Sequence, residues 1–486
     1  MTMRHILPFF ATALLTTASA AQAPGPAAPQ ATSQVPGLSA SERADGAKTN
    51  PQIIAQFGGV YNGPQAAYVR AVGQRIAVQS GMAARPGDYT VTLLNSNINN
   101  AFAVPGGYVY VTRELVALMN NEAELAFVMG HEVGHVAAQH AKKREERSGL
   151  AGLGAALLGA ITGSSVISNL ADTGAQLYAL GYSRDQEREA DSLGVRYLAR
   201  AGYDPMASGD ILAALGAQTT LEARLAGRDG AEPASWLSTH PANDERVARI
   251  RREAATLAAR AGPRAINRDA FLNAIDGMLY DDDPAQGIVS GRSFRHPGLG
   301  VSFEAPAGFA LENTPAAVVG TSKANGRFTF GGNAVRGLDI TGYSAKIWES
   351  AGARPAEVRA VRINGIDAGI SQARVNTRSG AVDATLAVYR WAPDSYYHLL
   401  MLAPAGGAAT FTPLVDSVRR LTPAEAAALR GRRVSVVTVR AGDSIASLAA
   451  RMAYDDDKVA RFMTLNGFSA TTRLVQGTRV KLIVFQ

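Results

Sequence analysis

The sequence predicts a multidomain protein: a mainly α-helical region with a small β-sheet, then an α+β sandwich, then a compact strand–helix–helix–strand unit. The chain has 486 residues, whereas one hydrophobic core rarely extends beyond ~250–300 residues. Apolar residues make up 47% and charged residues 18%, which is enough to bury several cores and argues against general disorder. The hydrophobic pattern changes from helical to short alternating runs near residue 287, and a compact unit follows near residue 435.

The first residues predict export. Arg4 and His5 precede an uncharged stretch that ends in the small residues Ala18-Ser19-Ala20, so residues 1–20 fit a signal peptide. A retained membrane anchor is the alternative, but ~18 or more apolar residues are expected of a span. Residues 21–37, rich in Ala, Pro and Gln, predict a disordered linker. We therefore expect a mature protein in the periplasm or cell envelope.

Composition excludes several kinds of site. The chain has no Cys, which rules out disulfides, thiolate metal sites and a thiol nucleophile. Any metal must therefore be held by His, Asp or Glu. The net charge of +7 is spread along the chain without a Lys/Arg block, so a nucleic-acid partner is not expected.

The chemistry is concentrated in residues 131–135, which read His-Glu-Val-Gly-His. A capping pattern at Asn121 predicts the start of a helix that runs through this motif. Residues four apart on a helix differ by ~40° around its axis, so His131 and His135 point the same way, with Glu132 beside them. Zinc needs this arrangement: two imidazoles, one further ligand and an open position for water.

His140 is a tempting third ligand, but nine residues separate it from His131, which is about 180° around a continuous helix. We therefore expect His140 to face away. The extended motif HExxHxxGxxH also fails, because positions 138 and 141 are both Ala.

A distant carboxylate is the remaining choice for the third ligand. Glu187 and Asp191 are four residues apart and share a helix face, whereas Glu189 points elsewhere. We interpret Glu187 as the ligand and Asp191 as a group that orients a ligating imidazole. A merely solvated acidic helix is the alternative.

Several independent motifs between about Ala55 and Arg251 resemble the M48 zinc metallopeptidases, in particular the soluble periplasmic quality-control type. They are Asn100–Gly107, the His-Glu-Val-Gly-His helix, the Glu187/Asp191 pair, Ala201–Pro205 and Ser238–Pro241. The resemblance implies a mainly helical gluzincin-type domain over residues 38–260. It also implies one Zn²⁺ per chain at His131, His135 and Glu187, with Glu132 as general base. Asp191 would be a proton donor by the same resemblance.

His240 lies in the Ser238–Pro241 segment and its role stays open. It could donate to the oxyanion, occupy the open metal position as a reversible plug, or be structural, since Pro241 can start a helix. We count it with the candidate catalytic residues. Residues 106–112 alternate as a short strand with two leading glycines, and a bare strand edge there could hold an extended or unfolded polypeptide by backbone pairing.

Residues 148–171 carry no charge and contain five glycines, which predicts a mobile lid or a membrane-surface contact rather than a span. Plain packing helices are the alternative. Residues 261–286 predict a helical connector, and residues 287–422 an α+β domain of unknown role. Residues 435–484 resemble a LysM module, which implies a βααβ fold and possible peptidoglycan contact. The alternative is a docking unit without glycan affinity.

Together these expectations describe an exported zinc metalloendopeptidase that hydrolyses misfolded or misassembled envelope proteins. Two alternatives remain open at this stage. One is a zinc hydrolase that cuts peptidoglycan cross-links, which a wall-binding module would favour. The other is a non-catalytic chaperone or scaffold for envelope assembly.

Overall fold

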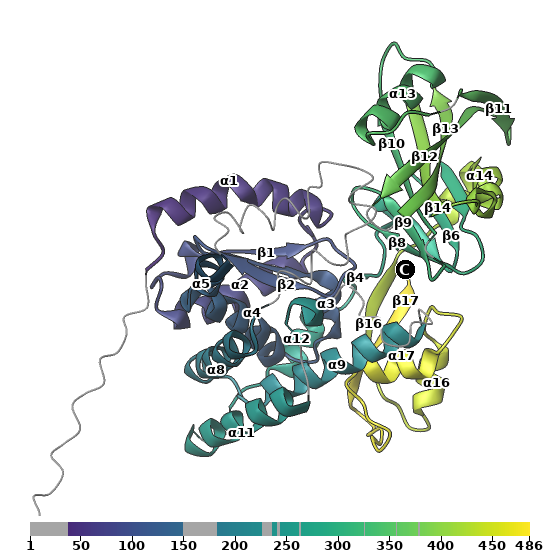
Figure 1. The fold of residues 1–486 in the computed structure, drawn as a ribbon. Helices are drawn as coiled ribbons and strands as arrows, with labels where there is room; N and C mark the ends of the chain where they lie inside the picture. Colours follow the sequence, from purple (N-terminus) through teal and green to yellow (C-terminus); the bar gives the residue numbers. More distant parts are fainter. Residues whose placement is uncertain are drawn as a thin grey trace, which may run out of the picture. The chain divides into compact units, whose positions relative to one another are not determined.

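The structure is a computed structural model, and it describes residues 37–148, 182–225, 236–240, 244–261, 264–324, 326–355, 357–377 and 380–486 (Figure 1). The predicted signal peptide, all but the last residue of the predicted linker 21–37, and all but the first residue of the charge-free segment 148–171 lie outside the described residues. Among the helices that are described, none has the length and apolar character needed to cross a membrane.

The region before residue 262 is mainly helical. Its elements are α1 (Ala40–Gln56), α2 (Gln65–Ala77), η1 (Val78–Ser80), η2 (Pro86–Asp88), β1 (Thr90–Leu94), β2 (Ala101–Val104), β3 (Tyr108–Thr112), α3 (Arg113–Leu118), α4 (Glu122–Ala137), α5 (His140–Ser148), α8 (Arg184–Arg200), α9 (Ala207–Leu225), α10 (Trp236–Thr239) and α11 (Asp244–Ala261).

Local sequence explains the two helices that matter most. The predicted start of α4 is confirmed: the Asn121 side chain accepts a hydrogen bond from the Glu124 backbone N–H. Ser183 and Gln186 form a reciprocal capping box at the start of α8. The interior of α4 is buried almost without interruption, so this helix lies inside the core. Its packing therefore fixes the direction of every side chain it carries.

The small sheet corrects one prediction. Its strand order is β1-β3-β2, with β1 parallel and β2 antiparallel to β3. The strand predicted within residues 106–112 is β3, which is central and paired on both sides, so it has no bare edge. Among the described strands, β2 is the edge strand on the antiparallel side of β3. The sequence could not show this, because strand order is a tertiary property.

The sheet-rich region follows. Its elements are α12 (Arg268–Ile275), β4 (Leu279–Tyr280), η3 (Pro284–Gln286), β5 (Ile288–Ser290), β6 (Ser293–His296), β7 (Val301–Glu304), β8 (Phe309–Asn313), β9 (Val318–Ser322), β10 (Arg327–Ala334), α13 (Ile340–Ser350), β11 (Arg359–Ile363), β12 (Ile366–Thr377), β13 (Gly380–Ala392), β14 (Ser395–Pro404), η4 (Ala408–Phe411), α14 (Thr412–Ser417), β15 (Arg419–Arg420) and α15 (Pro423–Ala428). A seven-stranded sheet runs β11-β12-β13-β14-β10-β9-β8, and a four-stranded sheet runs β15-β7-β6-β5. The coarse prediction of a helical region followed by a separate sheet-rich one is confirmed.

The C-terminal segment runs β16 (Arg432–Thr438), α16 (Ile445–Ala450), α17 (Lys458–Leu465) and β17 (Arg479–Phe485). Its sheet has the order β17-β16-β4, so a strand from the predicted helical connector 261–286 joins it. The connector is therefore not helical throughout: Gly277 adopts φ 75° after α12, and the chain turns into β4. One hydrophobic cluster contains both Leu482 of β17 and Leu125 of α4.

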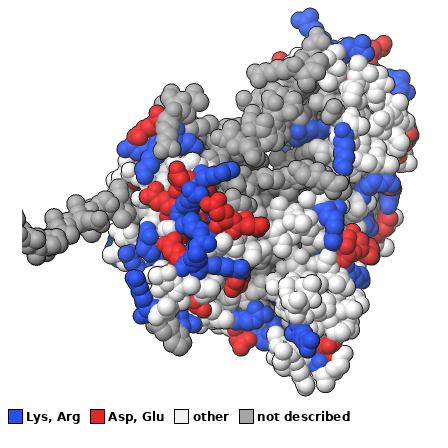
Figure 2. Space-filling view, turned by 60° about the horizontal axis from the view of Figure 1, so that its bottom comes forward, with Lys and Arg blue, Asp and Glu red and all other residues white. Residues whose placement is uncertain are grey.

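Charged side chains of both signs mix on the face drawn in Figure 2, which carries a cluster of intermingled Lys/Arg and Asp/Glu. Pairs join α8 to α11, for example Arg188 with Glu245 at 3.1 Å and Arg196 with Glu253 at 3.7 Å. Exposed pairs of this kind contribute little stability, about 0–1 kcal/mol each.

Candidate metal centre

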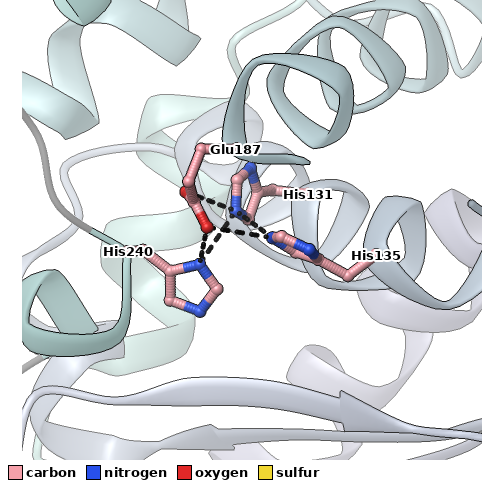
Figure 3. A group of neighbouring side chains, drawn as sticks. All are labelled: His131, His135, Glu187 and His240. Atoms are coloured by element: carbon pink, nitrogen blue, oxygen red, sulfur yellow. Dashed lines mark hydrogen bonds and ion pairs between the residues drawn. The ribbon is translucent and has the colours of Figure 1, made fainter. Parts of the chain in front are cut away.

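Four buried side chains from three helices converge at one point (Figure 3). His131 and His135 come from α4, Glu187 from the first turn of α8, and His240 from the residue directly after α10. One potential ligand atom from each lies within 4.8 Å of the others. The structure thus brings together all three residues predicted as ligands and adds His240 to them.

The distances suit a tetrahedral ion. His131 Nε2 lies 3.0 Å from His135 Nε2 and 3.2 Å from His240 Nδ1. Glu187 Oε1 lies 3.4 Å from His135 Nε2 and 2.9 Å from His240 Nδ1. Bonds of about 2.0–2.1 Å to a tetrahedral zinc ion place its ligands roughly 3.3 Å apart. Three nitrogens and a carboxylate oxygen, all removed from water, therefore fit zinc in both donor type and spacing.

Asp191 fixes the orientation of the first imidazole. Its Oδ1 lies 3.1 Å from His131 Nδ1, on the ring edge opposite the cluster, so Nε2 is left to face the other ligands. Arg246 donates to both Asp191 oxygens at 2.8 and 2.9 Å, and Arg249 donates to Oδ2 at 2.8 Å. The Asp191 carboxylate is fully buried and held from several directions, which fits an orienting role.

His140 orients the second imidazole, that of His135, and its position differs from the prediction. His140 Nδ1 lies 2.9 Å from His135 Nδ1, and His140 Nε2 lies 3.0 Å from Glu189 Oε2. The prediction that His140 faces away assumed one continuous helix, but α4 ends at Ala137 and Gln139 adopts φ 54°. The reversal turns His140 back toward His135 without placing it among the ligands. Glu189, which points away from the cluster as expected, completes this chain of contacts.

Glu132 lies beside the cluster, as its place in the motif predicts. Its Oε1 accepts a hydrogen bond of 2.7 Å from Trp236 Nε1 and lies 3.6 Å from His240 Nε2. The Trp236 ring stacks on the His240 ring, with centroids 4.6 Å apart and an interplanar angle of 18°. Trp236 was not predicted, because no motif spacing links it to Glu132. The available signal was its position four residues before His240.

Comparison with known proteins agrees with this geometry. Residues 64–254 match the family model described as Peptidase family M48. We refer to this matched region, residues 64–254, as the M48 domain. The beta-barrel assembly-enhancing protease of Yersinia pestis is 32% identical over 196 residues, which are 38% of this chain and 38% of that protein.

Two further relatives match the same kind of domain. The mitochondrial metalloendopeptidase OMA1 of Arabidopsis thaliana is 34% identical over 159 residues, 32% of this chain and 30% of that protein. The metalloprotease LoiP of Escherichia coli (strain K12) is 34% identical over 155 residues, 31% of this chain and 57% of that protein. This chain thus spans less than two thirds of the length of each of these relatives.

Electrostatics at the cluster favour an ionised Glu187 and a neutral His135. Burial by itself would raise the pKa of Glu187, but the neighbouring His240 and the contacts with His135 and His131 bring that pKa far below its usual range. Burial lowers the pKa of His135 well below that of a free imidazole. An ionised carboxylate and a neutral imidazole are the forms that bind zinc.

Arg246 of α11 is a further residue of the M48 domain that the sequence did not reveal. Its Nη1 lies 2.9 Å from Glu187 Oε2 and donates to the His240 backbone oxygen at 2.9 Å. One guanidinium thus contacts Glu187, His240 and Asp191 at once, which leaves Glu187 Oε1 directed at the imidazoles. Its position on α11, six residues after His240, has no chemical signature in sequence.

Proposed function

We propose that this protein is an exported zinc endopeptidase that hydrolyses peptide bonds of misfolded or misassembled envelope proteins. The convergence of His131, His135 and Glu187, with Glu132 beside them, carries the proposal. It is supported by the M48 domain and by the printed names of its relatives, which include a beta-barrel assembly-enhancing protease and a metalloprotease. One Zn²⁺ per chain is expected.

The residues divide the chemistry among them. A zinc ion at this site would supply a Lewis acid that brings the pKa of a water molecule toward ~7. Glu132 would accept a proton from the attacking water at its carboxylate and deliver it to the nitrogen of the leaving amine as the bond between this nitrogen and the carbonyl carbon breaks. The indole N–H of Trp236 fixes Glu132 Oε1, so the carboxylate is held in one orientation. Asp191 orients His131; its alternative role as a proton donor remains a prediction from family resemblance.

His240 has two roles compatible with its position. Its Nδ1 lies within the ligand cluster, which supports a reversible plug of the fourth metal position. Once displaced, the same imidazole could donate to the oxyanion. His240→Phe separates these roles: a plug predicts higher turnover in the variant, whereas an oxyanion donor predicts lower turnover. Unchanged turnover would exclude both.

The substrate is expected to be an extended polypeptide. The edge strand β2 carries backbone groups that can pair with such a chain, which confers broad sequence tolerance. Residues 435–484 are a proposed contact with peptidoglycan, and residues 148–171 a proposed contact with the membrane surface. Both would keep the enzyme near envelope substrates.

The decisive experiment measures zinc stoichiometry and casein hydrolysis for the mature protein and for Glu187→Gln. We expect about one zinc per wild-type chain and loss of both metal and activity in the variant. Asp185→Asn is the matched control, because this carboxylate is 92% exposed on the same helical turn. Metal retained by Glu187→Gln would reject the ligand assignment and direct attention to His240.

Two further measurements separate the competing functions. Incubation with casein and with purified sacculi distinguishes a protein substrate from peptidoglycan cross-links. Complementation of a deletion strain by Glu132→Gln tests for a scaffold: if this variant restores every phenotype, a peptidase role in the cell is excluded.

A further inference from the structure

A completely buried lysine joins the C-terminal segment to the M48 domain. Lys481 of β17 has 0% exposure. Its Nζ donates to the backbone oxygens of Ala117, Leu118 and Met119 at 2.7, 3.1 and 2.5 Å. Lysine is almost never fully buried unless its ammonium is satisfied. Here it binds the carbonyl end of α3, where backbone oxygens lack helical partners and the helix dipole favours a cation.

The carbonyls that Lys481 holds belong to the last two residues of α3 and to Met119, which begins the turn to α4. The neighbouring groups of this turn are held as well. Arg268 of α12 donates to the Asn120 backbone oxygen at 2.8 Å, and the Asn120 backbone N–H donates to Glu124 at 2.7 Å. The start of α4 is thus fixed by side chains, two of them cations from elements that follow the M48 domain in sequence.

Lys481 cannot move independently of the C-terminal segment. Its backbone N–H donates to Asn466 Oδ1 at 2.7 Å, and Asn466 Nδ2 donates back to its carbonyl at 2.9 Å. β17 pairs along its whole length with β16, which in turn pairs with β4. Figure 1 shows α17 of the same segment beside α9, and the two helices are in contact. The hydrophobic cluster of the M48 domain also continues into β16 and β17.

We propose that residues 432–485 are a structural part of the peptidase, not only a tethered module: through Lys481 they clamp the turn before α4 and so hold His131 and His135 in register with Glu187. Lys481 is in this sense a positioning residue. The inference deepens the proposed zinc-peptidase function and relies on it for the metal readout alone. The claim that Lys481 holds the turn before α4 can be tested whether or not the protein is a peptidase.

The connection from Lys481 to the metal ligands is a single helix. α4 runs without interruption from Glu122 to Ala137, and His131 lies nine residues after its first residue. At 1.5 Å per residue this is about 13.5 Å of rigid rod. A displacement of the first turn of α4 therefore also displaces the imidazoles of His131 and His135. A metal site tolerates displacements of only about 0.5 Å.

Lys481→Met tests the clamp, because methionine has a similar length but cannot donate. We expect amide exchange in residues 120–131 to become faster by a factor of about 10–100, since three buried carbonyls lose their donor. Zinc affinity, measured by competition with a chelator, should fall by about 10-fold at temperatures where the protein is still folded. Lys458→Met is the control, because this lysine of α17 makes only an exposed contact with the Ala450 carbonyl at 3.3 Å.

A lysine that merely stabilised the fold would lower the melting temperature and leave exchange in residues 120–131 and zinc affinity unchanged below it. That result for Lys481→Met would overturn the proposal. If zinc binding is absent even in the wild type, the proposed function fails, and the exchange measurement still decides the clamp.

Proteolytic cleavage between the sheet-rich region and the C-terminal segment gives a second test on the full chain. A protease site is inserted directly after Ala428, the last residue of the exposed helix α15. Cleavage there breaks the covalent link between the C-terminal segment and the rest of the chain. The clamp predicts that the C-terminal fragment co-elutes with the rest and that zinc affinity is retained. Separation of the fragments with unchanged zinc affinity would contradict it.

Discussion

The contact between α4 and α8 offers a quantitative test of how closely the metal ligands must be held. Gly194 of α8 faces α4 at the level of the first histidine of the motif. A Cβ at Gly194 would stand 3.1 Å from the His131 backbone nitrogen, 3.2 Å from Phe127 Cε2 and 3.3 Å from His131 Cα. Ordinary van der Waals contact begins at 3.4 Å. Gly194→Ala must therefore push the two helices apart by a few tenths of an ångström.

This displacement acts on the metal site directly, because His131 and His135 lie on α4 and Glu187 lies on α8. Metal–ligand distances tolerate only about 0.2 Å. We expect the dissociation constant for zinc to rise by roughly 10–100-fold in Gly194→Ala. Overpacking should cost about 1–3 kcal/mol of unfolding free energy, offset in part by about 1 kcal/mol from the higher helix propensity of alanine.

The assay is a chelator-competition titration of the apoprotein with zinc, together with thermal unfolding of both forms. Gly216→Ala is the matched control, since Gly216 lies within α9 and a Cβ there would meet nothing within 4 Å. The control should bind zinc like the wild type and be equally or more stable. Wild-type zinc affinity in Gly194→Ala would refute the argument that this helix spacing sets the ligand geometry.

Three other outcomes are expected. His140→Leu removes the group that orients His135 and should weaken zinc binding by about 10–100-fold in the same titration; an unchanged affinity would contradict the orienting role. Trp236→Phe removes the donor to Glu132 and should lower kcat by about 10-fold with zinc content unchanged, as measured with a fluorogenic peptide; loss of zinc instead would mean that Trp236 maintains the cluster. Burial raises the pKa of Asp282 from 3.8 to about 6, so the folded protein binds the proton more tightly than the unfolded chain, and stability contributed by the protonated form is lost as pH rises through this range. Chemical denaturation should show a stability difference between Asp282→Asn and wild type that shifts by roughly 2.4 kcal/mol in favour of the variant between pH 4 and pH 7. A difference constant with pH would contradict this cause.

The candidate site shows which inferences a sequence supports. The spacing of four between His131 and His135 has one geometric meaning on a helix, so their common direction could be predicted. Glu187 could be selected because its helix also carries Asp191 four residues later. These inferences use local periodicity, which is a property of the backbone and not of the surrounding fold.

The errors arose where the chain departs from regular geometry. His140 was expected to face away, and a single positive φ at Gln139 reverses that expectation. The predicted bare strand edge was assigned to β3, although β3 is the central strand of its sheet. The direction of His140 and the central position of β3 both depend on how segments pack in the fold. The hydrophobic period of the sequence does not encode this packing.

The sequence by itself determined the presence of a helix that carries the His-Glu-Val-Gly-His motif, its start at Asn121, the identity of three candidate ligands and the change from a helical to a sheet-rich pattern. These follow from short-range spacing and capping chemistry. Only the tertiary structure decided that Trp236 and Arg246 join the site, which of the open positions His240 takes, and that Lys481 reaches α3 from 363 or more residues further along the chain. Such contacts form because burying polar groups requires partners wherever the fold provides them, irrespective of their separation in sequence.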